Sequence, residues 1–142
     1  MKVQSLISML IGILGSLVTT LLGGWSAGMT TLVLFMVIDY ISGFIVAAVF
    51  KNSKKSVTGA LESKAGWKGL SKKCMTLFFV LIAYRLDLLI GTDYIRDAVV
   101  IGFCVNELIS IIENAGLMGI PLPSVIVKAL DVLKSKAEFD ED

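Results

Sequence analysis

The feature that most constrains this chain is a lysine-rich loop, residues 51–73, which lies between long apolar segments. The loop contains seven lysines and one glutamate, a formal charge of +6, whereas the whole chain of 142 residues carries only +1. Short basic loops between apolar spans stay in the cytoplasm, because lysine near the end of a span resists translocation. The flanking runs are too long and too apolar for a soluble protein. The loop therefore predicts a membrane protein and sets the direction in which the neighbouring segments cross.

Composition agrees with a membrane protein and excludes several function classes. Hydrophobic residues make up 56% of the chain and charged residues 18%, whereas a soluble domain averages about 45–50% and about 25%. The small net charge gives no reason to expect nucleic-acid binding. The sequence has no histidine, which is the commonest metal ligand and general base. We therefore expect no catalytic residue, no metal, no cofactor and no enzymatic activity.

Four apolar segments predict an all-α membrane protein whose helices form a bundle over residues 1–120. The second segment has 21 residues, which reach about 31 Å as a helix and cross a hydrocarbon core of about 30 Å. The first segment is uncharged and also resembles a signal peptide, so three spans are the alternative to four. The expected spans are residues 6–22, 30–50, 74–90 and 98–117.

The cytoplasmic position of the basic loop determines where the other segments lie. The N-terminus and the C-terminal tail, residues 121–142, are expected in the cytoplasm, and the turns 23–29 and 91–97 are expected outside. Pro121 and Pro123 end the last span, because proline breaks helical hydrogen bonding. Apolar residues in the tail recur at the spacing of one helix face, which predicts an amphipathic helix.

Lysines within the basic loop also fall on one face if its second half is helical. Lys64, Lys68 and Lys72 are spaced four residues apart, and Lys73 follows directly. Such a face suits a short helix lying on an anionic membrane surface, so membrane lipids are the expected partner. The alternative is a signal that only retains the loop in the cytoplasm.

Ionisable residues inside the apolar segments are the main candidates for function. At about 1.5 Å per residue, Asp39, Arg85 and Glu107 fall in one layer near the middle of the membrane, with Asp87 about 3 Å further out. A lone charge at that depth costs about 2.5–3.5 kcal/mol, so charges there should pair. We predict that Arg85 pairs with Asp39 or Glu107 across helices. Acids outnumber the single arginine, which favours groups that line water in an assembly over groups that only hold the bundle together.

Small and polar residues extend this set along two helix faces. Gly43 follows Asp39 by four residues, so the two share a face that suits contact with another helix. Polar residues in the last span recur every four positions, and such a stripe cannot face lipid without a large cost. The candidate residues for a pore or an oligomer interface are Asp39, Gly43, Arg85, Asp87, Asn106, Glu107, Ser110, Glu113 and Asn114.

Several short motifs follow one another in order across residues 32–136. They are Asp39-Tyr40-Ile41-Ser42-Gly43, residues 63–69 followed by Lys72-Lys73, Asp87, and residues 106–114 followed by Gly119, Pro121 and Pro123. In this order they resemble the phage holins of the toxin-secretion/phage-lysis family, which are small membrane proteins of Gram-positive phages. The first span and Arg85 lie outside the shared motifs.

The resemblance implies a role in host cell lysis. Holins accumulate in the bacterial cytoplasmic membrane, form homo-oligomers, and open lesions through which an endolysin reaches the cell wall or a stored toxin leaves. The endolysin or toxin is then a functional partner and not necessarily a physical one.

Two other function classes stay open on the residues alone. A small ion-coupled transporter or narrow channel also carries acids inside the membrane, although the uncharged first span counts against a small multidrug exporter. A non-conducting membrane scaffold would dock partners through the basic loop or the tail and would change no permeability.

Overall fold

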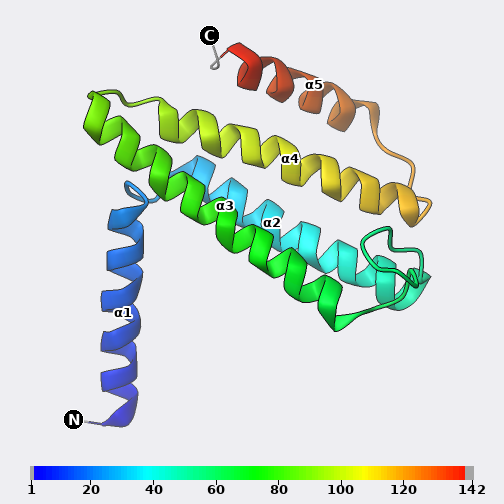
Figure 1. Cartoon of the computed structure of the whole chain (residues 1–142), viewed down its shortest axis with the longest axis horizontal. Helices are drawn as coiled ribbons and strands as arrows, with labels where there is room; N and C mark the ends of the chain where they lie inside the picture. Colours follow the sequence, from blue (N-terminus) through cyan, green and yellow to red (C-terminus); the bar gives the residue numbers. More distant parts are fainter. Residues whose placement is uncertain (1, 140–142) are drawn as a thin grey trace.

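The computed structural model describes residues 2–139 of the chain, with side chains through residue 136, and in this range every regular element is a helix. The predicted all-helical class is confirmed. The elements are α1 (Val3–Leu21), α2 (Ala27–Ile45), the π-helical η1 (Val46–Phe50), α3 (Ser63–Ile90), α4 (Ile95–Leu117) and α5 (Ser124–Phe139) (Figure 1).

Helices α2, α3 and α4 lie side by side and form a three-helix bundle, with α5 along the outer side of α4 (Figure 1). The closest packing is between α2 and α4, and α3 covers both. Met29, Leu32 and Val80 are fully buried at the centre of the apolar core, and Val100 and Cys104 pack against them. This core occupies the half of the bundle near the α3–α4 turn. The other half is therefore free for polar side chains.

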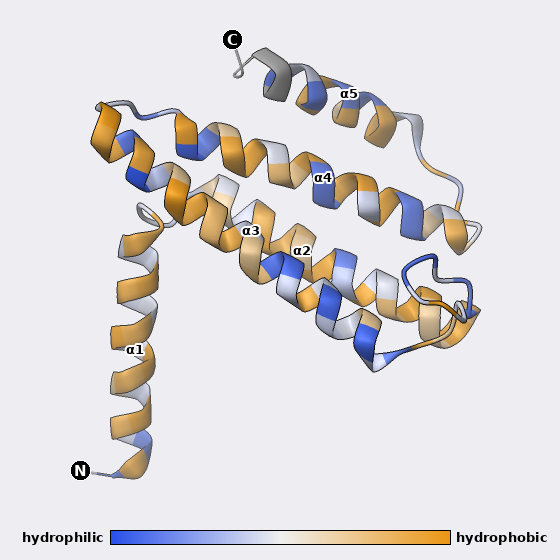
Figure 2. Ribbon diagram, viewed as in Figure 1, coloured by the Kyte–Doolittle hydropathy of each residue, from blue (hydrophilic) through white to orange (hydrophobic). Residues whose placement is uncertain are grey.

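Helix α1 extends away from the bundle, across the direction of the other helices, and none of its residues is buried (Figure 1). Its surface is apolar on nearly all sides (Figure 2). The change of direction occurs at Gly23 and Gly24, whose φ angles of 84° and 90° lie in the left-handed region that glycine adopts without strain. At Gly23 a Cβ would come within 2.5 Å of the Tyr84 ring, so the turn also needs a residue without a side chain.

Two helices in the described part of the chain are long and apolar enough to cross a membrane, Val3–Leu21 and Ala27–Phe50. They correspond to the first two predicted spans. The number of crossings beyond these two stays a prediction, because length and composition alone identify only this pair.

Helix α3 is longer than the predicted third span. It begins at Ser63 inside the basic loop and has 28 residues, which reach about 42 Å. The lysines of the predicted surface helix therefore form the first turns of α3, where hydrophilic residues are grouped (Figure 2). Of the predicted basic loop, only residues 51–62 lie outside the helices. The predicted tail helix is present as α5, which buries Leu130.

Candidate functional site

The centre of the polar half of the bundle is an ion-pair cluster formed by Asp39, Lys73 and Glu107, which we call the charge cluster. The ammonium of Lys73 donates to Asp39 Oδ2 at 2.7 Å and to Glu107 Oε2 at 2.6 Å. The side chains of Lys73, Asp39 and Glu107 are 12%, 9% and 10% exposed. Each comes from a different helix, so this one lysine connects α2, α3 and α4.

The charge cluster carries one more negative charge than positive charge, because two carboxylates share one ammonium. Charge-assisted hydrogen bonds at these lengths are strong. Removal of one member of a buried ion pair leaves an uncompensated charge, which is far more costly than the pair itself. The cluster therefore fixes the three helices relative to one another and keeps a surplus acid inside the bundle.

Polar groups on both sides of Asp39 complete its surroundings. The buried Asn114 amide donates to Asp39 Oδ1 at 3.2 Å and to the Ser42 hydroxyl at 2.8 Å. The Lys55 ammonium lies 3.5 Å from Asp39 Oδ1 and donates to Ser110 Oγ at 3.1 Å. Buried polar groups are stable when they are hydrogen-bonded in this way. Lys55 adds the positive charge that makes the whole set neutral.

Gly43 provides the room for these contacts. A Cβ built at Gly43 would lie 3.7 Å from the Asn114 amide nitrogen and 3.8 Å from the Lys55 ammonium. A methyl group fits at these distances, but a larger side chain would displace one or both groups. Sequence spacing placed Gly43 at a helix contact, and in the structure that contact is with the polar groups around Asp39.

A cavity of about 590 Å³ lies beside the charge cluster, between α2, α3, α4 and the loop 51–62. Asp39, Lys73 and Glu107 all reach it. The polar stripe of α4 contributes Asn106, Ser110 and Glu113, and α3 contributes Lys68, Lys72 and Thr76. A cavity with this many charged and polar groups is suited to water.

The ion pair predicted for Arg85 is wrong. Arg85 is exposed on α3, and within residues 2–136 it forms no ion pair with Asp39 or Glu107, which both pair with Lys73. The depth count assumed that the third helix starts near residue 74. Because α3 starts at Ser63, Lys73 lies ten residues into the helix, about 15 Å from its beginning, and not at the membrane boundary.

Asp87 is buried at the opposite end of α3, away from the charge cluster. Its carboxylate accepts hydrogen bonds from the Thr92 hydroxyl at 2.7 Å and from the backbone N–H groups of Ile95 and Arg96 at 3.0 and 2.8 Å. The first N–H groups of a helix lack partners within the helix, and a carboxylate there satisfies them. Asp87 therefore caps the start of α4 and makes no contact with the cavity.

Arg96 is a structural residue that the sequence did not single out. Its guanidinium donates to the Gly23 carbonyl at 2.8 Å, the Gly24 carbonyl at 3.0 Å and the Ser26 hydroxyl at 3.2 Å. It fastens the α1–α2 turn to the start of α4. The available signal was that Arg96 is the only cation in the predicted outer turns and faces a Gly-Gly turn whose carbonyls need donors.

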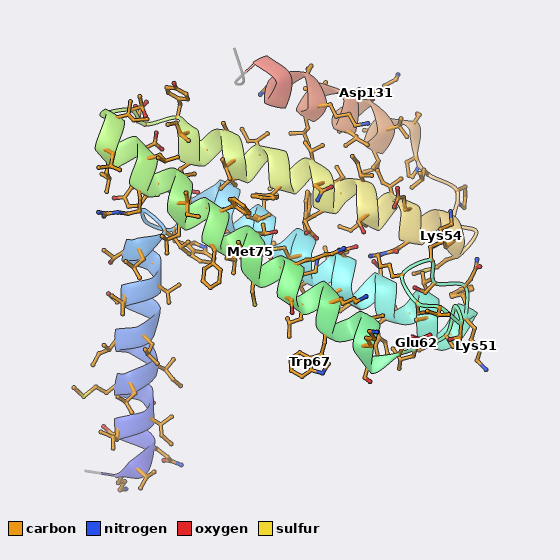
Figure 3. All side chains as sticks on the ribbon, in the orientation of Figure 1. Lys51, Lys54, Glu62, Trp67, Met75 and Asp131 are labelled. Atoms are coloured by element: carbon orange, nitrogen blue, oxygen red, sulfur yellow. The ribbon has the colours of Figure 1, made fainter. Side chains whose placement is uncertain are left out.

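The other candidate residues are distributed over the surface. Asn106 and Glu113 are exposed at the cavity, and Ser110 is half-buried between them. Lys64, Lys68 and Lys72 are exposed on the first turns of α3. Trp67, 69% exposed, projects from the same turns away from the bundle (Figure 3). Among the described residues no group of three metal-ligating side chains occurs.

Comparison with known proteins assigns the chain to a family. Residues 16–135 match the bacteriophage holin family. The chain belongs to this family. The resemblance drawn from the motifs is thus confirmed, and holins are non-enzymatic membrane proteins that act as oligomers.

Individual relatives of this holin come from phage and bacteria. A protein of Bacillus phage phi105 named as a probable holin is 31% identical over 110 residues, which are 74% of this chain and 76% of the relative. An uncharacterised protein of Listeria monocytogenes is 40% identical over 112 residues, 78% of this chain and 74% of the relative. An uncharacterised protein of Clostridium perfringens is 34% identical over 125 residues, 87% of this chain and 89% of the relative. No solved structure matches the holin.

Proposed function

We propose that this holin accumulates in the bacterial cytoplasmic membrane, assembles with copies of itself, and opens lesions that release an endolysin or a stored toxin. The observation that carries the proposal is the charge cluster, which keeps a surplus carboxylate beside a polar cavity within an apolar helical protein. Ionisable groups within membrane segments mark water-filled pathways far more often than they face lipid.

The physical argument is a difference between the single chain and the assembly. In a single chain the surplus acid of the charge cluster is neutralised only by Lys55, whose side chain is 54% exposed, and a charge left alone within the membrane costs about 2.5–3.5 kcal/mol. In an assembly whose helices surround water, the same group is hydrated and this cost disappears. The charge cluster therefore favours the assembled, water-lined state once enough chains are present.

The polar face of α4 is the proposed lining of the lesion. Asn106, Ser110 and Glu113 are spaced as neighbours on one helix face, and they reach the cavity together. Arg85 is exposed on α3 among apolar side chains. An arginine in that position needs water or an acid, so we place it at a contact with a second copy or at the lumen.

The proposed topology keeps the loop 51–62, the first turns of α3 and α5 in the cytoplasm. Lys64, Lys68 and Trp67 then lie at the anionic inner surface, where basic and aromatic residues are favoured. Four crossings require α1 to turn at Gly23 and Gly24 and to insert beside the bundle. A reporter fused to the N-terminus distinguishes the cases, because a cytoplasmic N-terminus supports four crossings and an external one supports three.

The function is tested by induced expression in bacteria together with a cytoplasmic cell-wall hydrolase. We expect the hydrolase to escape abruptly after a delay, with small dyes leaving at the same time. Leakage of protons and small ions without the hydrolase would replace the lesion with a narrow channel or transporter. Normal growth with full accumulation of the protein and no leakage would leave a scaffold as the function.

A further inference from the structure

The loop 51–62, which we call the plug, is a compact structure and not an open connection. Its backbone closes on itself through the Ser53 N–H, which donates to the Gly59 carbonyl at 2.9 Å. Thr58 donates to the Glu62 carboxylate through its hydroxyl at 2.8 Å and its N–H at 3.0 Å. Gly59 has a φ of 76°, and a Cβ there would lie 2.8 Å from the Lys51 carbonyl. These contacts give the plug a defined shape.

The plug lies over the end of the bundle where α3 begins and α4 ends, marked by Lys51, Lys54 and Glu62 in Figure 3. It forms one wall of the cavity through Ser53, Lys55, Ser56, Ala60, Leu61 and Glu62. The remaining walls come from α2, α3 and α4. The cavity is already partly open beside the exposed Asn106 and Glu113. Movement of the plug would therefore widen this opening without any change in the helix bundle.

The plug is attached to the helices by few side-chain contacts. Lys55 reaches Ser110 at 3.1 Å and Asp39 at 3.5 Å, and the Asn52 amide donates to the Leu117 carbonyl at 3.5 Å. The Lys55 side chain is 54% exposed, whereas that of Lys73 is 12% exposed. Exposed ion pairs are weak because water competes for both partners. The Lys55 contact can therefore break while the Lys73 contacts persist.

We propose that the plug inhibits lesion formation and that Lys55 holds it closed; this inference rests on the proposed function. With Lys55 in place, two carboxylates face two ammonium groups, and the set is neutral. When Lys55 leaves, the charge cluster keeps a net charge of −1 beside an open cavity. The uncompensated acid is then more stable in a water-lined assembly than in a single chain surrounded by lipid. Release of the plug thus shifts the population toward the lesion.

The first test measures access to the cavity in inside-out membrane vesicles. Thr76, which is buried and lines the cavity, is changed to cysteine in a chain that also carries Cys74→Ser and Cys104→Ala. A membrane-impermeant maleimide then reports access from the cytoplasmic side. We expect Lys55→Met to raise the labelling rate about two- to fivefold, the range set by loss of a half-exposed ion pair. Lys55→Arg should label like the parent.

Matched controls separate the contact from the charge. Lys54→Met removes the same charge from the neighbouring position, and Lys54 forms no side-chain hydrogen bond or ion pair within residues 2–136, so labelling should not change. A chain that keeps Cys104 and has Cys74→Ser is the negative control, because Cys104 is buried in the apolar core and not at the cavity.

The second test measures the onset of hydrolase escape at equal membrane accumulation. Lys55→Met should lyse cells earlier than the parent, and Lys54→Met should not. Equal labelling or equal onset for the two variants overturns the proposal. If the parent releases no hydrolase, lesion formation itself fails, and the vesicle labelling still decides whether Lys55 holds the plug closed.

Discussion

The two ends of the bundle use buried charges in different ways. At one end Asp87 and Arg96 bond mainly to backbone groups, and these bonds complete a turn and a helix start. At the other end Asp39 and Glu107 both bond to Lys73 beside a cavity, and the remaining negative charge is balanced only by the half-exposed Lys55. The second arrangement holds a charge whose stability depends on one exposed ion pair and on water, and the proposed function relies on this difference.

The largest expected effect comes from Lys73→Met, which removes the shared cation of the charge cluster. Two buried carboxylates then share only the half-exposed Lys55, which lies 3.5 Å from Asp39, and loss of one member of a buried pair costs about 3–5 kcal/mol. We expect poor membrane accumulation and a large fall in thermal stability in detergent. Lys72→Met, at an exposed neighbouring position, is the control. Equal behaviour of the two variants would mean that the cluster is not what fixes the helices.

A smaller effect is expected from Arg96→Ala, at the other end of the bundle. Hydrogen bonds to charged groups contribute about 1.5–3 kcal/mol, and the backbone carbonyls left behind can be hydrated at the membrane surface. The protein should still accumulate, but the α1–α2 turn should become more sensitive to protease than in the parent. Unchanged cleavage would show that Arg96 does not hold α1 in position.

Arg85→Gln separates stability from function. Arg85 is exposed and outside the charge cluster, so the thermal stability of the detergent-solubilised chain should change by less than about 0.5 kcal/mol. The onset of lysis should nevertheless shift, because we place this residue at a contact between copies or in the lumen. A loss of stability as large as that of Lys73→Met would mean that Arg85 does form a buried ion pair with Asp39 or Glu107.

The smallest effect concerns pH and lies in the plug. Hydrogen bonds from the backbone and side chain of Thr58 lower the pKa of Glu62 below its ordinary value. Because the pKa is lower in the folded loop, the stabilisation is present above the ordinary glutamate pKa and is lost as the pH falls through the folded value. Amide exchange at Thr58, compared at equal intrinsic rate, should lose protection only on acidification. Glu62→Gln should remove this dependence, and persistence of it would assign the effect to another group.

Helix ends were easier to predict than helix beginnings. The predicted ends at residues 50, 90 and 117 agree with η1, α3 and α4. Each is followed within two residues by a residue with positive φ, namely Lys51, Gly91 or Gly119, which ends the helix. The beginning of α3 was missed because its first turns are basic and contain Gly66 and Gly69, which disfavour a helix in isolation. In the structure these glycines let the Tyr40 ring pack against α3.

Part of the predicted polar set comes together in the structure, but around a lysine that the sequence did not name as a partner. The role of this set in a pore or an oligomer interface stays a prediction. Asp39, Gly43, Glu107, Ser110 and Asn114 do meet in one place, since an acid or amide in an apolar run has few other stable surroundings. The partner of the acids was predicted from depth alone, which named Arg85. The depth of a residue in the membrane does not say which side of the helix it lies on. In the structure α3 is rotated so that Lys73 faces the other helices and Arg85 faces outward.

The sequence by itself determined the helical class and the membership of the holin family, because apolar length and motif order are properties of the chain. The tertiary structure decided which lysine pairs with both acids, that Asp87 and Arg96 are structural, and that the loop 51–62 forms one wall of the cavity. These depend on how three helices are rotated and shifted against one another, and a pair of charges separated by more than thirty residues meets only when packing brings both faces together.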